Sequence, residues 1–395
     1  MMQQPHVAGP FPEPAEPARV AGPDRIRVMI VNSTLHIGGA EQVAACLGER
    51  LGRDGFEVSA CYLKEPGINA DRMLHAGVDL VPIPGLIPGK RDYLTFLKLR
   101  RLIKQRRIEV IHTHDIHGLI DGSACRLTTP GLKLVHTWHY GNYPHRSAHH
   151  KRIEGTLWRV PDALVAVGHE QSKSIRNLYG IPENRMRVLW NGVDDPRERG
   201  VSPERFAELR TDVPIIASIS TLIEQKGLKH LLDAVALLRD SGEQFQLALV
   251  GGGVLEKPLR EQAEKLQLGE HVKFLGWMAH AADRVLPFAD IFVQSSLWEA
   301  MSIVVLEAMA HQKAMVVTSV GENPHVVLNE ETGLVVPPAN PAALAEGLRR
   351  LLRDRELRQR LASAARRRYE QTCTVGHMIA AHEKLYAELV HDARR

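Results

Sequence analysis

The sequence predicts an α/β protein with two domains, each built on a parallel sheet that helices cover on both faces. Short strands that are apolar on both faces alternate with helical patterns, and the alternation restarts after a polar segment at 194–212. Strands buried on both faces are typical of parallel sheets, whose crossover connections are helices. The chain has 395 residues, of which 44% are hydrophobic, so it can form two or three domains of roughly 150 residues.

The first domain is expected over residues 25–195. A helical pattern at 38–51 follows the first strand and ends at Gly52 and Gly55, and a second helical pattern covers 92–107. The candidate strands of this domain lie at 26–31, 57–63, 79–83, 108–113, 132–138 and 162–168.

The second domain is expected over residues 196–370, with a helix at 227–240. Its candidate strands lie at 214–220, 245–251, 271–276, 290–294, 314–318 and 333–337. The remaining segment, 371–395, includes TVGHMIAAHEKLYAELV (374–390), whose apolar residues recur with the spacing of a helix that packs on a neighbour. A helix at this end of the chain can cross back to the first domain, and the predicted fold includes that crossing.

The composition excludes several classes of protein. Residues 1–24 are rich in Pro and Ala and lack the apolar region of a signal peptide, so we expect a disordered tail. No apolar run approaches the roughly 18 residues of a membrane-spanning helix. The net charge of +4 is too small to indicate nucleic acid. No C-x-x-C pair, which would indicate a zinc site, occurs among Cys46, Cys61, Cys125 and Cys373. We therefore expect a cytoplasmic protein that binds no nucleic acid.

Two glutamates follow the strand at 290–294, on the side of a parallel sheet where ligands bind. Ser302 is expected to be the N-cap of a helix over IVVLEAMA, which leaves the amides of residues 301–304 available to a diphosphate. Glu307 would lie in the second turn, where both carboxylate oxygens can accept hydrogen bonds from a ribose diol, while Glu299 reaches another part of the ligand. In isolation such a pair is more often two solvated side chains on an amphipathic helix.

The surrounding motifs favour the ligand-binding interpretation. The Ser-x-x-x-Glu loop at 295–299 followed by LEAMA resembles the retaining family 4 glycosyltransferases, which have the GT-B fold. Other segments agree in the same order along residues 26–340. They are GGAE (38–41), RVLWNGVD (187–194), Lys226–Gly227, LVGGG (249–253), VKFLG (272–276) and TSVGENPHVVLNEETGLVVPP (318–338).

The resemblance implies two Rossmann-like domains that face each other across a cleft, with the acceptor on the first and the nucleotide sugar on the second. Glu307 resembles the residue that binds the nucleotide ribose, and Glu299 the residue that holds the donor sugar. Lys226 would neutralise the leaving diphosphate. The implied catalytic residues are His114, Lys226 and Glu299. The implied donor-binding residues are Gly38, Gly39, Thr221, Lys226, Gly251, Ala300, Met301, Ser302, Ile303 and Glu307.

Histidines follow a strand of the first domain in IHTHDIHG (111–118). His114 resembles the family's histidine near the donor sugar and the acceptor, and His117 and His139 are candidates for the acceptor side of the cleft. Three histidines could suggest a metal site. We expect His112, His114 and His117 to fall on alternating faces, however, and no carboxylate or cysteine cluster completes a coordination shell. We therefore expect neither a metal nor any other cofactor, and we interpret His112 as a partly buried structural residue.

The sequence departs from the family pattern in three places. Thr221 stands where members usually carry an arginine shortly before Lys226, and the loss of such a charged contact could cost about 2–3 kcal/mol, or some 30- to 150-fold in rate. Either another cation replaces that arginine or the activity is reduced. In addition, His325 replaces a glutamate after Asn-Pro, and Ala300 replaces a glycine.

One helical pattern also suits a membrane surface. The segment LKLRRLIKQRR (97–107) combines an apolar stripe with cations, as do helices that bind anionic lipid headgroups, although a solvated helix over a core stripe is the usual case. The Arg-rich segment 348–368 is expected to be a solvated helix. A peripheral position at the cytoplasmic face of a membrane is consistent with the lipid-linked acceptors that the family often uses.

The resemblance implies the transfer of a sugar from a nucleoside diphosphate sugar, with UDP favoured, to a hydroxyl of a glycan or lipid-linked acceptor. The implied mechanism is a metal-independent front-face attack with retention of configuration, in polysaccharide or glycolipid assembly. One alternative is a sugar-nucleotide epimerase of the same architecture. Another is a non-catalytic glycosyltransferase-like binding subunit, which Thr221 favours and the residues His114, Lys226, Glu299 and Glu307 oppose.

Overall fold

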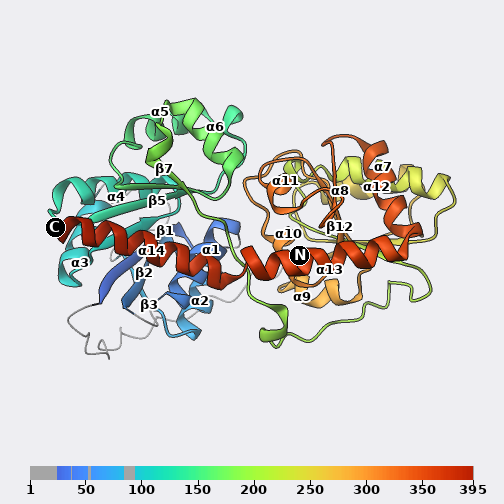
Figure 1. Cartoon of the computed structure of the whole chain (residues 1–395), viewed down its shortest axis with the longest axis horizontal. Helices are drawn as coiled ribbons and strands as arrows, with labels where there is room; N and C mark the ends of the chain where they lie inside the picture. The colour runs from blue at the N-terminus through green and yellow to red at the C-terminus, as the bar shows by residue number, and fades with distance from the viewer. Residues whose placement is uncertain (1–24, 37, 52–54, 84–93, 395) are drawn as a thin grey trace, which may run out of the picture.

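Two parallel sheets, each flanked by helices, form the α/β architecture expected from the sequence (Figure 1). The computed structural model describes residues 25–36, 38–51, 55–83 and 94–394. The tail expected at 1–24, Gly52 at the end of the first helix, and the start of the pattern at 92–107 lie outside the described residues.

The first sheet has seven parallel strands in the order β3-β2-β1-β4-β5-β6-β7. All six expected strands are present, with ends that differ from the expected ones by at most three residues. A short seventh strand, β7, was not expected and pairs with β6 at the sheet edge. The strands are β1 (Ile26–Thr34), β2 (Phe56–Glu65), β3 (Asp79–Pro82), β4 (Val110–Thr113), β5 (Lys133–Trp138), β6 (Ala163–Ala166) and β7 (Met186–Val188).

The helices of the first domain connect these strands and cover both faces of the sheet. In α3 the apolar stripe buries Leu99 and Ile103, while the exposed side carries cations. The helices are α1 (Gly39–Arg50), α2 (Ile68–His75), α3 (Thr95–Gln105), α4 (Ile116–Thr128), α5 (Ala148–Leu157) and α6 (His169–Tyr179), with single 3-10 turns at Tyr143–His145 and Glu183–Arg185.

The second sheet has six parallel strands in the order β10-β9-β8-β11-β12-β13. Its strands are β8 (Ile215–Ile219), β9 (Gln246–Val250), β10 (Val272–Gly276), β11 (Ile291–Gln294), β12 (Ala314–Thr318) and β13 (Leu334–Val336). Its helices are α7 (Leu228–Asp240), α8 (Glu256–Lys265), α9 (Ala281–Val285), α10 (Ile303–Ala310), α11 (Asn323–Val326), α12 (Pro341–Arg353) and α13 (Arg355–Thr372), with 3-10 turns at Pro196–Glu198, Glu224–Lys226 and Leu286–Phe288.

The last helix, α14 (Val375–Arg394), crosses back and lies on the first domain, as the fold prediction included (Figure 1). Its apolar residues Met378, Ile379 and Tyr386 are buried in the same cluster as the strands of the first sheet. The hydroxyl of Tyr386 also lies 2.6 Å from Nδ1 of His112 in β4. Among the described residues, no helix combines the length and the hydropathy needed to span a bilayer.

The chain passes between the domains twice, and the two passages lie side by side. The amide of Val193 donates to the carbonyl of Cys373 at 3.0 Å, and the amide of Val375 donates back to Val193 at 3.1 Å. A Cβ on Gly192 would come within 2.3 Å of the Thr374 carbonyl oxygen, so only glycine permits this close approach. These crossings fix the two domains beside each other with a cavity between them.

Candidate functional site

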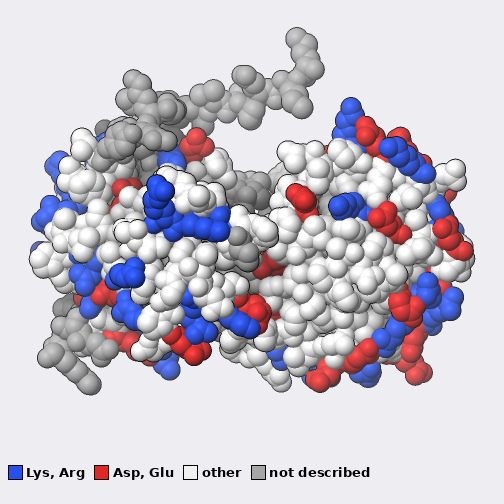
Figure 2. Space-filling view, turned by 90° about the horizontal axis from the view of Figure 1, so that it is seen from above, with Lys and Arg blue, Asp and Glu red and all other residues white. Residues whose placement is uncertain are grey.

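A cavity of about 710 Å³ lies between the two domains, which form the two lobes in Figure 2. Helices α1 and α2, the interdomain linker, the loops after β8, β9 and β10, and helix α10 all contribute to its walls. Five of the expected donor-binding residues are brought together in this lining: Gly38, Thr221, Gly251, Ile303 and Glu307. Carboxyl ends of parallel strands therefore meet at the predicted cleft.

Glu307 lies on α10 with its side chain 12% exposed, and its nearest cation comes from the linker. Nη1 of Arg199 is 3.5 Å from the Glu307 carboxylate and 3.0 Å from the carboxylate of Asp283. Burial raises the pKa of Glu307 to about 7, against the lowering influence of Arg199. Near neutral pH this carboxyl therefore titrates, and the linker arginine favours its charged form.

Lys226 and Glu299 form a partly buried ion pair at the end of the second sheet. The Lys226 ammonium is 2.5 Å from Glu299 Oε1, which also accepts a hydrogen bond from the Ser296 hydroxyl at 2.8 Å. The Gln225 side-chain amide donates to Glu299 Oε2 at 3.1 Å. The cation and the carboxylate that the sequence predicted for diphosphate and sugar binding are thus in direct contact.

The N-terminus of α10 differs in one detail from the expectation. Ser302 is the N-cap residue, but its side chain makes no capping hydrogen bond and instead accepts from the Gln294 amide at 2.5 Å. Ala300, Met301 and Ser302 are all buried. The amides of the first helical turn have no acceptor within the helix, which suits an anionic ligand.

Of the three expected glycines, Gly251 has a steric reason to be glycine. Gly251 has φ +137°, and a Cβ there would lie 1.8 Å from the carbonyl oxygen of Ser220. At Gly38, where the backbone is extended, an added Cβ would meet only the end of the Glu41 side chain, which can rotate away. Nothing lies within 4 Å of a Cβ built on Gly39, which is also absent from the cavity lining.

In the first domain, His114 and His139 are in contact, and neither is among the residues that line the cavity. His114 Nδ1 lies 3.0 Å from His139 Nε2, and the two rings stack. Burial lowers the pKa of His139 to about 3 and the pKa of His114 well below its ordinary value, with further lowering from neighbouring histidines. Both imidazoles are therefore neutral at pH 7. His114 Nε2 is buried and has no hydrogen-bond partner among the described residues.

Two expectations about the neighbouring histidines were wrong. His112 and His114 do not fall on different faces, because their ring centroids are only 4.1 Å apart. His114 directly follows β4 and continues its alternation, in which residues two apart point to the same side. His112 is also fully buried rather than partly buried, since it bonds Tyr386 and Thr137 through its two nitrogens. His117 is exposed, and its Nε2 lies 2.7 Å from the Lys64 ammonium.

The two sides of the cleft meet at Gly141 of the first domain. A Cβ on this residue would lie 2.3 Å from the backbone carbonyl carbon of Glu299 and 2.4 Å from the amide nitrogen of Ala300. Gly141 follows His139 by two residues, so the segment that carries His139 approaches the Glu299 loop. The histidine pair and the Lys226–Glu299 pair lie outside the cavity lining itself. Gly321 approaches the same loop from the second domain, with the Glu299 carbonyl oxygen 2.2 Å from its ideal Cβ position.

Arginines that the sequence did not single out line the same cavity as Thr221, where the usual cation is missing. Each one contacts a carboxylate. Arg50 pairs with Asp194, Arg72 with Glu49, and Arg199 with Asp283 and Glu307. No local pattern marks these residues, since Arg199 lies in a linker and the others are ordinary polar positions on helices.

Comparisons with known proteins agree with this architecture. The family model described as Glycosyltransferase Family 4 matches residues 37–197, and the model described as Glycosyl transferases group 1 matches residues 202–368. The chain is 26% identical over 322 residues to alpha-D-kanosaminyltransferase of Streptomyces kanamyceticus, covering 72% of this chain and 81% of that protein. It is 28% identical to alpha-maltose-1-phosphate synthase of Mycolicibacterium smegmatis, covering 71% and 79%.

Solved structures are similar over nearly the whole chain. Anabaena HepE in complex with UDP superposes with a TM-score of 0.79 at 19% identity, covering 92% of this chain and 100% of that chain. A glycosyltransferase from Rickettsia africae gives a TM-score of 0.79 at 18% identity, covering 93% and 99%. At this level of identity the similarity establishes the fold.

Proposed function

Because the chain belongs to the family 4 glycosyltransferases of the GT-B fold, we propose that it transfers a sugar from a UDP-sugar to an acceptor hydroxyl with retention of configuration. The observation that carries this proposal is the interdomain cavity that brings Glu307, Thr221 and Gly251 together. The choice of UDP draws support from HepE, which has been solved in complexes with UDP, with UDP and glucose, and with UDP-glucose.

The second domain would bind the donor. The Glu307 carboxylate would accept hydrogen bonds from the ribose hydroxyls, and the amides at the N-terminus of α10 would bind the diphosphate. Lys226 lies beside Glu299 at 2.5 Å, so the pair would open toward the ligand, with the ammonium on the diphosphate and the carboxylate on the sugar. Each group then exchanges one buried partner for another and is never left unpaired.

In the transfer step, the acceptor oxygen would form a bond to the anomeric carbon on the face that the diphosphate leaves. The bond from that carbon to the diphosphate oxygen breaks, and its electron pair stays with the leaving group. The acceptor proton passes to a diphosphate oxygen, and Lys226 stabilises the developing charge. Neutral His114 would use its unpartnered Nε2 for a hydrogen bond to a sugar or acceptor hydroxyl. No metal or cofactor takes part in this proposal.

Arg199 would supply part of the charge that Thr221 lacks. It is 18% exposed, lines the cavity and lies 3.5 Å from Glu307, so it can hold the ribose-binding carboxylate in its charged form. A positive charge would still be missing beside the diphosphate, because Arg199 already donates hydrogen bonds to Asp283 and to the carbonyl of Asp194.

The acceptor would be a glycan or a lipid-linked glycan, and α3 with the residue before it offers a surface for a membrane. Leu94 and Leu97 are 56% and 46% exposed beside the exposed cations Arg101 and Lys104. Apolar side chains flanked by cations suit anionic headgroups. This surface would place the enzyme at the cytoplasmic face of a membrane.

Thermal-shift and calorimetric titration with UDP, GDP and ADP and their glucose conjugates would test the donor site. We expect UDP to stabilise the native chain and Glu307→Gln to weaken its binding about 10- to 100-fold, because a charged acceptor is lost. The exposed Glu331→Gln variant is the control. Thr221→Arg should bind UDP more tightly than the native chain. If no nucleotide stabilises the native chain, the proposed donor site is wrong, and the non-catalytic alternative gains support.

Transfer assays then separate the enzyme classes. A transferase consumes UDP-sugar faster when an acceptor is added, whereas an epimerase converts the donor or releases its sugar without one.

A further inference from the structure

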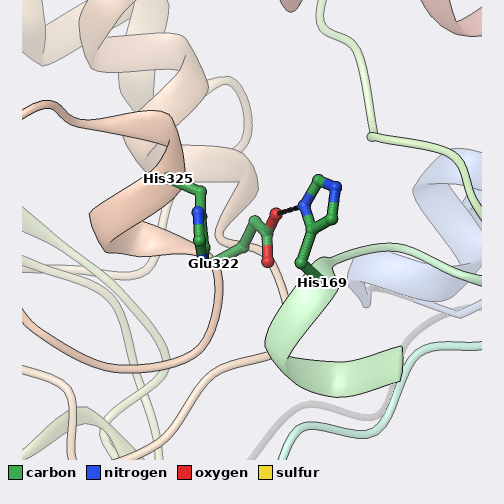
Figure 3. A group of neighbouring side chains, drawn as sticks. All are labelled: His169, Glu322 and His325. Atoms are coloured by element: carbon green, nitrogen blue, oxygen red, sulfur yellow. Dashed lines mark hydrogen bonds and ion pairs between the residues drawn. The ribbon is translucent and has the colours of Figure 1, made fainter. Parts of the chain in front are cut away.

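A second group of side chains joins the domains outside the donor cavity (Figure 3). His169 is the first residue of α6 in the first domain, whereas Glu322 and His325 lie at α11 in the second domain. One ligand atom from each residue lies within 4.8 Å of the others. This set of three residues, the interdomain triad, contains two imidazoles and one carboxylate.

The buried member of the triad is Glu322, whose side chain has no exposure to solvent. Its Oε1 accepts hydrogen bonds from His169 Nδ1 at 2.6 Å and from the Trp190 indole at 2.8 Å. Its Oε2 accepts a long bond of 3.4 Å from the amide of Glu170. A Cβ on Gly168 would lie 2.6 Å from Oε2, so a glycine there leaves room for the carboxylate. The first domain and the linker thus position this carboxylate from the second domain.

The histidines are the accessible members. The side chains of His169 and His325 are 57% and 45% exposed, and their ring centroids are 5.4 Å apart. His325 Nε2 also lies 3.8 Å from the carboxylate of Glu170, which is therefore within reach as a further ligand. An ion in solution could enter this group without disturbing the core.

We propose that the interdomain triad binds a divalent transition metal of the zinc class. Two imidazole nitrogens and one carboxylate oxygen are ligands that zinc prefers, while magnesium and calcium require oxygen ligands. Around a tetrahedral zinc ion, ligand atoms at about 2.1 Å from the metal lie about 3.4 Å apart. The three ligand atoms lie within 4.8 Å of one another, so the half-exposed histidine side chains would have to move inward by roughly 1–1.5 Å.

The hydrogen bonds of Glu322 are compatible with a bound metal ion. His169 and Glu322 share one proton across 2.6 Å, and the metal would take the place of that proton. The Trp190 bond to Glu322 can remain, because a carboxylate has about four lone-pair positions. Trp190 would then orient a ligating carboxylate from the outer shell, a role that commonly strengthens metal binding. Glu170 or a water molecule would complete the coordination.

A metal bound by the interdomain triad would connect the two domains next to the loop that contains Glu299. The amide of Glu322 donates to the carbonyl of Ala300 at 2.9 Å, and the preceding residue, Gly321, packs against Glu299. The ion would hold the present arrangement of the two domains and take no part in sugar transfer. This inference is independent of the proposed reaction.

Titration of the metal-stripped full chain with Co²⁺, followed by visible absorption and calorimetry, tests the site. We expect one ion per chain, with the d–d bands of a nitrogen- and oxygen-ligated site, and displacement by Zn²⁺. His169→Ala and His325→Ala should each weaken binding at least about tenfold, since even outer-shell changes have effects of that size. Both side chains are half-exposed, so these variants should fold, and circular dichroism checks that they do.

His36→Ala is the matched control. His36 forms an exposed pair with Glu65 at 2.8 Å that resembles the His169–Glu322 pair but has no second histidine in the contacts described. Its removal should leave Co²⁺ affinity unchanged. If the native chain binds no Co²⁺, or if the His169 and His325 variants bind it as well as the His36 variant does, the proposal is overturned.

Discussion

The two walls of the cleft differ in how they present polar groups. The first domain contributes His114 and His139, whose pKa values are lowered by burial so that both rings are neutral at pH 7. The second domain contributes charges: the Lys226–Glu299 ion pair and Glu307, whose partner Arg199 comes from the linker. The residues assigned to the reaction are thus neutral imidazoles in the first domain and paired ions in the second. Arg50 and Arg72 of the first domain also line the cavity, each paired with a carboxylate.

This difference matches the two tasks of a sugar transferase. A diphosphate carries charge that a neutral imidazole cannot neutralise, so donor affinity should depend on the second wall. Sugar and acceptor hydroxyls are neutral and need positioned hydrogen bonds, which neutral histidines supply without desolvating a charge. Donor binding should therefore respond to changes on one wall, whereas transfer should respond to changes on both.

The largest expected effect comes from removing the cation of the second wall. Lys226→Met should lower the rate of sugar transfer about 10²–10³-fold, because it removes a preorganised charge from the leaving group. It should also weaken UDP binding. Glu299 keeps its bonds from Gln225 and Ser296, so the fold should survive. Lys229→Met, an exposed change on α7, is the control, and a Lys226 variant as active as this control would contradict the assigned role.

The contact between the walls offers the next test. Gly141→Ala would place a Cβ 2.3 Å from the Glu299 backbone. The Gly141 segment and the Glu299 loop would have to move apart, at a cost of about 1–3 kcal/mol. We expect kcat/KM for transfer to fall roughly 5- to 150-fold as the walls separate. Gly269→Ala, where an added Cβ meets nothing within 4 Å, is the control. Equal activity of the two variants would mean that the walls need not touch during transfer.

A smaller change on the first wall should alter transfer without altering donor affinity. Asparagine can replace His114 Nδ1 and keep the bond to His139, but it has no atom at Nε2. Loss of one neutral hydrogen bond should lower kcat/KM for transfer about tenfold in His114→Asn while the Kd for UDP stays unchanged. His114→Gln, which places a polar atom near Nε2, should recover part of that loss. A weaker Kd for UDP in His114→Asn would show that both walls bind the nucleotide.

The fold could be predicted from the sequence because its strands are buried on both faces and its helices have clear apolar stripes. The strand β7 was missed because its three residues are too few to show a period. The same alternation rule could have placed His112 and His114 on one face, since His114 directly follows the strand that contains His112 and lies two residues from it.

The site could be predicted only where residues lie in recognisable motifs. Glu307 and Thr221 belong to such motifs and lie in the same cavity. Arg199 was missed because it comes from an irregular linker, whose path depends on tertiary packing. His169 and Glu322 are 153 residues apart and belong to different domains, so no local pattern can bring them together.

The smallest expected effect concerns the charge state of Glu307. Its pKa is raised to about 7, so the carboxylate that we propose for ribose binding is about half formed at pH 7, nearly complete by pH 8 and mostly lost at pH 6. UDP-glucose is the suitable ligand, because its diphosphate is esterified at both ends and does not titrate in this range. Its affinity should rise several-fold from pH 6 to pH 8 in the native chain.

Arg199→Met should move this transition to higher pH, because the arginine lowers the pKa of Glu307 and its removal leaves burial unopposed. The variant should bind UDP-glucose a few-fold more weakly than the native chain at pH 7 and approach it at higher pH. Glu307→Gln, which cannot titrate, should show no such dependence. If the native chain binds UDP-glucose with the same affinity from pH 6 to pH 8, the nucleotide binds elsewhere and the Glu307 carboxylate does not contact it.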